Sequence, residues 1–274
     1  MGPTQAGSVR RRSAGGSSRE SIRNRSHQGR EHVVSTTELG RLTTAAITAA
    51  ERANAATITE AAALVLGCLR ADALVLTAGA GHSLAAVAET FYRAGGLAPV
   101  YPVYHPDLLP MHGAGASTLA ERRQGLAAEV LSGIGPGPGD VLVVFSTSGV
   151  NPYPLELASH AREAGLAVVA VTSPASSAAA PRRGGGILAE QADVVLDTGI
   201  RPGDASYPEQ APRTAALSTI VNAHLWNLVL ASVLELAAAE GLEVPLWRSS
   251  NTVGGDEANA ALLERYRPRV PPLR

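Results

Sequence analysis

The chain lacks several residues on which common classes of protein depend. It has one cysteine, Cys68, which excludes an internal disulfide and a multi-cysteine metal site and suits a reducing cytoplasm. All 23 basic residues are arginine, because no lysine occurs anywhere in the sequence. Chemistry through a lysine Schiff base is therefore excluded. A standard P-loop is excluded as well, because its lysine reaches the phosphates of the nucleotide.

Long apolar runs and aromatic residues are also scarce. No apolar run approaches the ~20 residues that a membrane span needs, and no signal-peptide core follows the N-terminus. We therefore expect a cytoplasmic protein with no membrane partner. Aromatic residues make up 4% of a chain that is 45% hydrophobic, so alanine, leucine and valine must build the core. The length of 274 residues fits one large α/β domain, or one domain with appendages.

The first 36 residues differ from the rest, because arginine, serine and glycine dominate them without apolar periodicity. This composition predicts a disordered basic arm. The arm holds seven arginines and two glutamates, a net charge of +5, so the total of −1 leaves −6 for the remainder. A basic arm can contact nucleic acid, but the acidic remainder shows no recognition helix, so we expect a solvated tail. Residues 37–274 are predicted to form a single domain with N-terminal helices and a C-terminal tail.

The stretch from Asp140 to Asn151 organises the rest of the chain. Residues 141–145 form a continuous apolar run, which is typical of a parallel strand covered on both faces. Small polar residues follow, and a helical pattern begins near Pro152; these residues are Ser146, Thr147, Ser148 and Gly149. Hydroxyls and free backbone N–H groups at a helix N-terminus favour an anion. The turn therefore predicts a phosphate site, with a simple Ser/Thr helix cap as the alternative.

Other strands end in the same way. Residues 73–77 lead into the glycine turn of residues 79–83, and residues 167–171 lead into Thr172 and Ser173. A short strand is expected at 193–197, and helices at 36–69, 117–131, 155–164 and 213–240. Strands that alternate with helices predict a mostly parallel sheet with helices on both faces. Because ligands bind at the carboxyl ends of such strands, the coincidence favours a phosphate site over capping alone.

A dinucleotide site is the competing interpretation of the first glycine turn. The Rossmann fingerprint requires a third glycine or alanine, where this chain has Leu84, and an acidic residue after the next strand. The segment from Pro99 to Tyr104 ends in His105-Pro106-Asp107, without a clear ribose-binding acid. Dinucleotide binding is therefore the weaker alternative.

The motifs GAGHS at 79–83, STSG at 146–149 and VTS at 171–173 together resemble a sugar isomerase (SIS) phosphosugar-binding domain over about residues 36–260. More narrowly, the chain resembles the UPF0309 subfamily. The residues that support this are Glu89 with the sequence FYRAGG at 91–96, Asn151, Gly203-Asp204-Ala205, and Ser250-Asn251 followed by GGDE at 254–257.

The resemblance implies a three-layer α/β sandwich with a five-stranded, mostly parallel sheet. It implies a phosphorylated sugar as the ligand and a homodimer or homotetramer whose subunits share sites. It also implies an aldose–ketose isomerase, with a non-catalytic phosphosugar sensor or a lyase or etherase as alternatives. No cofactor or metal is expected. The implied ligand-binding residues are Gly81, Ser83, Ser146, Thr147, Ser148, Gly149, Asn151, Thr172, Ser173 and Asn251.

Isomerisation through an enediol needs a base near neutral pH and a donor that polarises the carbonyl. Glu89, on the helix that opens at the first turn, is the first candidate base, with an i,i+4 ion pair to Arg93 as the alternative. Glu121 is the second candidate, with a surface ion pair as its alternative. His82 borders the anion turn and could donate to the phosphate or act as an acid or base, with a structural turn residue as the alternative. His224 is the remaining candidate, although its place in an apolar pattern favours a core histidine.

Two further features leave alternatives open. His105, Asp107 and His112 invite a metal-site interpretation, but their loose spacing and the lack of a third nearby histidine make this a minor alternative. The glycine-rich tail that holds Asn251, Asp256 and Glu257 would suit a strap over a sugar, or a plain C-terminal turn.

Overall fold

The computed structural model describes Gly2 and residues 36–274. The basic arm expected over residues 1–36 therefore lies outside the described residues, apart from Gly2 and Thr36. Residues 36–274 form one compact unit. All the predicted strands and the predicted site residues belong to this unit.

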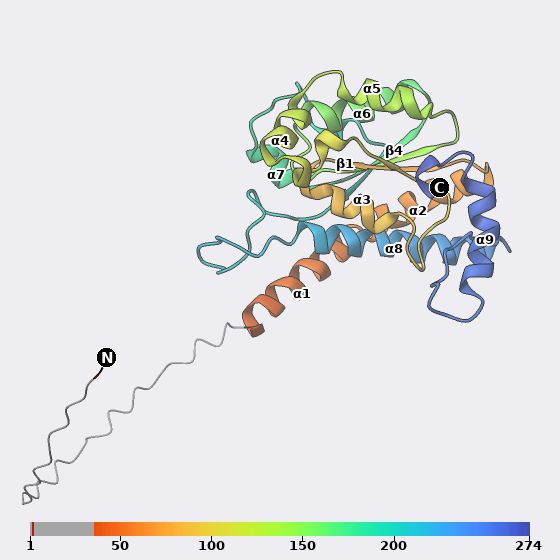
Figure 1. Ribbon diagram of the computed structural model, residues 1–274. Coiled ribbons are helices and arrows are strands. Elements are labelled where there is room, and N and C mark those ends of the chain that lie inside the picture. Colours follow the sequence, from red (N-terminus) through yellow and green to blue (C-terminus); the bar gives the residue numbers. More distant parts are fainter. Residues whose placement is uncertain (1, 3–35) are drawn as a thin grey trace, which may run out of the picture. The chain divides into compact units, whose positions relative to one another are not determined.

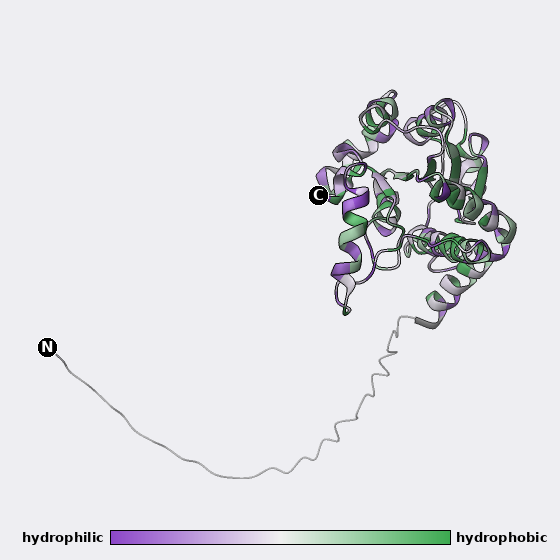
Figure 2. Cartoon of the chain, turned by 90° about the vertical axis from the view of Figure 1, so that its right-hand side faces the viewer, coloured by the Kyte–Doolittle hydropathy of each residue, from purple (hydrophilic) through white to green (hydrophobic). Residues whose placement is uncertain are grey.

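In this unit the strands form one five-stranded parallel sheet in the order β2-β1-β3-β4-β5. The strands are β1 (Val75–Gly79), β2 (Val100–Val103), β3 (Val141–Phe145), β4 (Ala167–Thr172) and β5 (Val194–Asp197). Every residue of β1 and β3 is buried, which explains the continuous apolar sequence of β3. The hydropathy colouring of Figure 2 shows these strands among the most hydrophobic parts of the chain. The predicted α/β fold class is confirmed.

Helices cover both faces of the sheet (Figure 1). One face carries α4 (Ala114–Arg122), α5 (Leu126–Ile134) and α6 (Pro152–Glu163), and the other carries α2 (Ala55–Arg70), α3 (Leu84–Thr90) and α8 (Ser218–Ala239). The remaining helices are α1 (Thr36–Ala53), which packs on α8, α7 (Pro174–Ala179), and α9 (Gly255–Tyr266). Short 3-10 turns are η1 (Gly81–Ser83), η2 (Pro106–Leu108), η3 (Pro110–His112), η4 (Leu188–Glu190) and η5 (Pro271–Leu273).

The strand order places a switch point between β1 and β3. The chain passes from β1 to β2 on one side of the sheet and then crosses to β3 on the other side. The turns that follow β1 and β3 therefore diverge at the carboxyl edge and leave a crevice between them. These are the two turns that carry the GAGHS and STSG motifs.

α8 is the helix that a length and hydropathy criterion would accept as a membrane span. In this structure it packs against α2, and it buries residues such as Val221, Leu225 and Val229. The core helix of a globular domain meets the same criterion, because a helix in a protein interior is apolar on most of its faces. The hydropathy of α8 is thus explained by packing inside the domain.

Two of the predicted helices differ clearly from those in the structure. The helix expected at 117–131 is two helices, α4 and α5, because Gly125 adopts a left-handed backbone with φ of +82° and redirects the chain. α8 begins at Ser218 rather than at residue 213, because the Asp204 carboxylate accepts hydrogen bonds from the backbone N–H groups of Leu217 and Ser218.

Candidate functional site

A pocket of about 490 Å³ opens at the switch point between the turns after β1 and β3. Its volume lies in the range of small-molecule sites. It is lined by Ala80, Gly81, His82, Ser83, Glu121, Ser146, Thr147, Ser148, Asn151, Ser176, Ala179, Ala180, Pro202, Gly203, Asp204 and Ser218. The two turns that the sequence predicts as an anion site therefore face a common cavity.

The serine turn presents unused hydrogen-bond donors to this pocket. The hydroxyl of Ser146 accepts a hydrogen bond from the backbone N–H of Gly149 at 3.2 Å, which leaves its own proton available. Within residues 36–274, the hydroxyls of Thr147 and Ser148 and the backbone N–H groups of these two residues have no hydrogen-bond partner. Both side chains are half-buried. Partly desolvated donors of this kind favour an anionic ligand.

The end of β4 and the start of α7 hold the serine turn from behind. Ser173 N–H and Thr172 Oγ1 both donate to the Thr147 carbonyl, at 3.0 and 3.3 Å, and Ser177 Oγ donates to the Ser148 carbonyl at 2.6 Å. Ser173 Oγ itself donates to the Ile200 carbonyl at 2.6 Å. Neither Thr172 nor Ser173 lines the pocket. In this structure they position the turn rather than face a ligand.

Gly149 allows the turn to pack closely against the segment that precedes β5. Its φ is +58°, and a Cβ at this position would lie 2.8 Å from Leu188 Cβ and 3.1 Å from Thr172 Oγ1. The Leu188 backbone N–H also donates to the Gly149 carbonyl at 2.8 Å. Gly149 therefore serves the predicted site through backbone geometry, without lining the pocket.

The N-terminus of α6 offers fewer donors than the sequence pattern suggests. The helix begins with Pro152 and has a second proline at Pro154, and proline has no backbone N–H. Asn151 is the N-cap residue, but its side chain makes no capping hydrogen bond. Tyr153, between the prolines, is fully buried, and burial raises the pKa of its phenol. The hydroxyl turn, more than the helix terminus, supplies the donors of this site.

The first glycine turn supplies the opposite wall. Gly81, with φ of +59°, His82 and Ser83 form the 3-10 turn η1 and line the pocket. The His82 imidazole is exposed, and the Ser83 side chain makes no capping hydrogen bond to α3. An imidazole and a hydroxyl therefore face the same cavity as the serine turn.

Two carboxylates also line the pocket. Glu121, near the end of α4, is half-buried and has no ion-pair partner in the described part of the chain. Asp204 accepts from the backbone N–H groups of Leu217 and Ser218, both at 3.1 Å, and from Ser218 Oγ at 2.5 Å. The Asp204 carboxylate therefore stabilises the start of α8. The Glu121 carboxylate makes no such bonds in the described chain and could accept a proton from a ligand.

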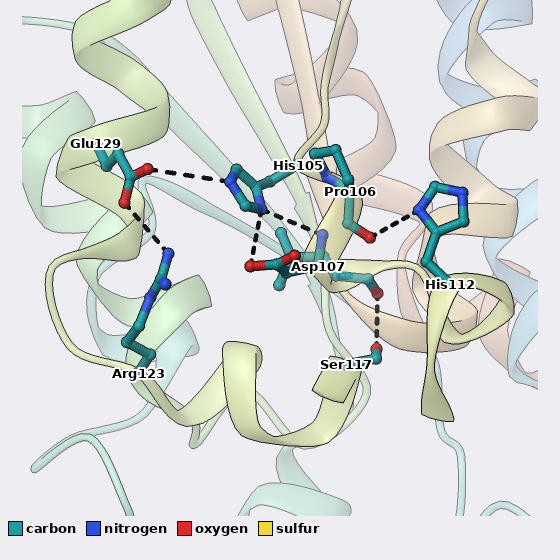
Figure 3. Close-up of polar contacts among 8 residues, drawn as sticks. His105, Pro106, Asp107, His112, Ser117, Arg123 and Glu129 are labelled. Atoms are coloured by element: carbon teal, nitrogen blue, oxygen red, sulfur yellow. Dashed lines mark hydrogen bonds and ion pairs between the residues drawn. The ribbon is translucent and has the colours of Figure 1, made fainter. Parts of the chain in front are cut away.

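The segment before α4 fixes the helix that carries Glu121 (Figure 3). His105 Nδ1 accepts from the Asp107 N–H at 3.2 Å, and its Nε2 lies 4.0 Å from Glu129 Oε1. His112 Nδ1 bonds the Pro106 carbonyl at 3.1 Å, and Ser117 Oγ donates to the Leu108 carbonyl at 2.8 Å. Figure 3 shows the two imidazoles turned toward different partners. No group of three or more histidine, cysteine, aspartate or glutamate residues in the described chain is placed to hold a metal ion.

Two of the predicted catalytic residues do not line the pocket. Glu89 forms an i,i+4 ion pair with Arg93, which is the alternative that the sequence left open. His224 is half-buried, and its Nε2 lies 3.4 Å from Glu51 Oε2 of α1. His82 and Glu121 are thus the candidate acid–base groups that the fold brings to the serine turn.

The predicted C-terminal strap lies elsewhere. The segment before it pairs with the chain just ahead of β2, because Trp247 N–H donates to the Gly96 carbonyl at 3.0 Å and Gly95 N–H donates to the Trp247 carbonyl at 2.8 Å. This places Asn251 toward the amino edge of the sheet, and it does not line the pocket. Asn251 N–H donates to Ser249 Oγ at 3.2 Å, so the segment forms a local turn. Figure 1 shows α9, which follows it, at the opposite end of the molecule from α7.

Sequence reasoning missed part of the pocket wall. Asp204, Ser218 and Ser176 line it, although none of them was a predicted site residue. The signal was present in the sequence, because the loop after β5 starts at the same carboxyl edge as the serine turn. Ser176 follows β4 at that edge and donates through its hydroxyl to the Ile200 carbonyl at 2.8 Å.

Comparisons with known proteins agree with this architecture. The sequence matches the SIS domain family over residues 41–173. A UPF0309 protein of Geobacillus kaustophilus is 37% identical over 218 residues, which cover 78% of this chain and 87% of that protein. A UPF0309 protein of Brucella canis is 40% identical over 221 residues, which cover 80% and 90% of the two chains.

Solved structures with a related chain trace include two phosphoheptose isomerases. The enzyme from Neisseria gonorrhoeae is 24% identical with a TM-score of 0.45, over 70% of this chain and 94% of that chain. The enzyme from Francisella tularensis is 17% identical with a TM-score of 0.49, over 74% and 98% of the two chains.

Proposed function

Because this chain belongs to the UPF0309 family and contains a SIS domain, we propose that it binds a phosphorylated sugar and interconverts an aldose and a ketose. The substrate class is a hexose phosphate or an amino-sugar phosphate. The observation that carries the proposal is the pocket at the switch point. Hydroxyl and amide donors without a partner in the described chain lie on one wall of this pocket, and the Glu121 carboxylate, which has no ion-pair partner among the same residues, also lines it. The donors suit a phosphate, and the carboxylate suits a proton transfer.

The phosphate binds against the serine turn. Ser146, Thr147 and Ser148 supply hydroxyl donors, and Ser83 adds one from the opposite wall. The backbone N–H groups of Thr147 and Ser148 add two more donors. Hydrogen bonds to an ionised acceptor are stronger than those between neutral groups, so a dianionic phosphate gains more from this turn than an uncharged sugar does.

Glu121 is the proposed base. Its carboxylate removes the proton from the carbon next to the carbonyl, and the electron pair of that C–H bond forms the enediolate while negative charge moves to the carbonyl oxygen. His82 donates a hydrogen bond or a proton to that oxygen. His82, after giving its proton to that oxygen, takes the proton of the hydroxyl on the neighbouring carbon, whose oxygen becomes the new carbonyl, while Glu121 returns its proton to the former carbonyl carbon and completes the isomerisation. The substrate supplies both the oxidised and the reduced carbon, so the reaction needs no cofactor.

Glu89, His224 and Asn251 would have to act from a second subunit if they take part. They do not line the pocket of their own chain. A homodimer or homotetramer with shared sites remains our proposal for the assembly, and the cytoplasm remains our proposal for its location.

Product analysis tests the reaction. The protein is incubated with aldose and ketose phosphates and with their unphosphorylated counterparts in D₂O, and the products are followed by NMR. We expect an isomer from a phosphorylated sugar only, with deuterium on the carbon that receives the proton, because the enediol exchanges its proton with solvent. Glu121→Gln should lower turnover by a factor of about 10²–10⁴, which is the usual contribution of acid–base catalysis.

Glu163→Gln, at the end of α6, is the matched control and should leave turnover unchanged. A second product in place of an isomer would indicate a lyase or etherase. Binding without any turnover would indicate a sensor. If no sugar phosphate binds, the proposal is wrong.

A further inference from the structure

The residues that line the pocket carry more negative than positive charge, which disfavours a phosphate dianion. Among the lining residues in the described chain there is no arginine, whereas Glu121 and Asp204 both contribute carboxylates. The two prolines at the start of α6 remove backbone donors from the helix end that faces the serine turn. Hydroxyl groups carry no formal charge, so the serine turn offers a dianion directional donors but no permanently charged cation.

One arginine side chain contacts this wall. Arg183 Nη1 donates to Asn151 Oδ1 at 3.4 Å, and Asn151 lines the pocket beside the serine turn. The distance lies beyond the ordinary range for such a bond, and the amide is an uncharged partner. Asn151 is 8% exposed, whereas Arg183 is an exposed residue. The guanidinium therefore rests at the pocket edge on a weak contact that it can exchange for a stronger one.

The backbone holds Arg183 at this position. The N–H groups of Arg183 and Gly184 both donate to the Val150 carbonyl, at 3.2 and 2.9 Å. Gly184 lies so close to the start of α6 that a Cβ there would meet Leu155 Cδ1 at 2.3 Å and the Asn151 carbonyl carbon at 3.3 Å. The loop after α7 is thus fastened to the residue that follows the serine turn, and only side-chain rotation is needed for the guanidinium to turn inward.

We infer that Arg183 is the cation that completes the phosphate site, moving from Asn151 Oδ1 to the phosphate oxygens of the ligand. This inference rests on the proposed function and adds a specificity-determining residue to it. The planar guanidinium can donate two parallel hydrogen bonds to a phosphate, which a hydroxyl cannot do. Its positive charge offsets the nearby carboxylates. Arg183 thereby favours phosphorylated over unphosphorylated sugars.

The test measures the binding of inorganic phosphate to the full chain by isothermal titration calorimetry at low ionic strength. Arg183→Gln should weaken binding by about 10- to 100-fold, the effect of losing a charge-assisted bidentate contact. Arg183→Lys keeps the positive charge but loses the two parallel donors of the guanidinium. Its phosphate affinity should therefore lie between those of the unmodified chain and Arg183→Gln. Arg162→Gln removes the same charge from the last turn of α6, about 15 Å along the helix from Pro152 at 1.5 Å per residue. It should bind phosphate as the unmodified chain does.

The outcomes separate this inference from the proposed reaction. Equal affinities for the unmodified chain and Arg183→Gln would overturn the role of Arg183 and leave the isomerase proposal standing. If Arg162→Gln lost as much phosphate affinity as Arg183→Gln, the effect would come from the net charge of the protein. That result would also overturn the specific role of Arg183. Phosphate binding that depends on Arg183, without turnover of any sugar phosphate, would support the role of Arg183 in the phosphate site and contradict the proposed isomerase reaction. If the unmodified chain binds no phosphate, both proposals fail. Circular dichroism and thermal unfolding of each variant confirm that the fold is retained.

Discussion

The polar residues at the two edges of the sheet differ in how far their hydrogen bonds are satisfied within the described chain. At the amino edge the polar groups bond one another or the backbone: Asp140 accepts from the N–H groups of Leu74 and Gly137, and Asp193 accepts from Val168 N–H. Near the C-terminal tail, Asn259 donates to and accepts from the backbone of Arg248. At the carboxyl edge, within the described residues, the Thr147 and Ser148 hydroxyls and the Glu121 carboxylate have no partner.

This difference shows how a candidate ligand site can be distinguished from a structural hydrogen-bond network. A buried or half-buried polar group without a partner costs free energy, and native structures rarely retain one without a reason. Partnered groups at the amino edge stabilise the fold, whereas the donors at the carboxyl edge that have no partner in the described chain are the ones that we propose bind a ligand. Substitutions of the partnered groups at the amino edge should therefore change stability and leave binding intact, and substitutions of the donors without a partner at the carboxyl edge should do the reverse.

The largest effect on stability is expected from Asp140→Ala. This change removes two hydrogen bonds from a charged acceptor, at 2.8 Å to Leu74 N–H and 3.0 Å to Gly137 N–H, and leaves both donors unsatisfied. We expect the free energy of unfolding to fall by about 3 kcal/mol, since each bond to a charged group contributes roughly 1.5–3 kcal/mol. Urea denaturation measures the loss. If phosphate affinity fell as well, at a temperature where the variant is folded, the separation of the two edges would be wrong.

The counterpart at the carboxyl edge is Ser148→Ala. The Ser148 hydroxyl has no partner in the described chain, so its removal should leave the free energy of unfolding within about 0.5 kcal/mol, as for an ordinary surface change. Affinity for a sugar phosphate should fall by about 10- to 100-fold, because one hydrogen bond to an ionised ligand is lost. Titration calorimetry and urea denaturation are run on the same samples.

Ser132→Ala is the control for this variant, because the Ser132 hydroxyl bonds a backbone carbonyl within α5, away from the pocket. It should leave affinity unchanged. A Ser148→Ala protein that binds normally but unfolds more easily would show that the hydroxyl is structural.

The architecture and the two turns could be predicted because local sequence determines them. The apolar runs at 141–145 and 167–171 are buried strands in the structure, and the hydroxyls that follow them come together because parallel strands share their carboxyl edge. The donor-poor start of α6 could also have been predicted, since Pro152 and Pro154 are visible in the sequence. The sequence pattern drew attention to the helix terminus and not to its prolines.

The remaining features depend on contacts between distant residues. Glu121 reaches the pocket because η2 and η3 fix α4, and Ser117 bonds a carbonyl nine residues earlier in the chain. Asn251 lies near the amino edge because Leu97 pairs with Leu246, a pairing that no local pattern predicts. Helical spacing placed Glu89 near the ligand, but that spacing equally suited the ion pair with Arg93 that the structure shows.

Alkaline pH should lower the free energy of unfolding through a residue at the amino edge, by less than the Asp140→Ala substitution does. Cys68 is 2% exposed, and burial, with Asp140 as a second cause, raises the pKa of its thiol from 9.0 to about 12. The unfolded chain therefore loses this proton above pH 9 while the folded chain keeps it, so the contribution of the neutral thiol is complete below pH 9 and is lost as pH rises toward 12. We expect a loss of about 1 kcal/mol in the free energy of unfolding by pH 10 from this group.

Urea denaturation at pH 7.5 and pH 10 isolates this contribution when Cys68→Ala is compared with the unmodified chain. The variant should lose about 1 kcal/mol less than the unmodified chain between the two pH values. An equal loss in both proteins would show that Cys68 is not the titrating group.

The smallest effect on unfolding and on phosphate affinity is expected from Glu89→Gln. This variant also tests whether a residue that does not line the pocket of its own chain takes part in catalysis. Glu89, on α3, pairs with the exposed Arg93, which lies beyond the end of that helix, and Glu89 does not line the pocket of its own chain. An exposed i,i+4 pair contributes about 0.3–0.5 kcal/mol, so the change should scarcely alter unfolding or phosphate affinity. The same glutamate is also the base that helical spacing favours, and it could reach a pocket in a neighbouring subunit. Turnover of a sugar phosphate therefore decides its role: unchanged turnover would show that Glu89 takes no part in catalysis, whereas a loss of turnover with normal binding would show that α3 of one subunit completes the active site of another.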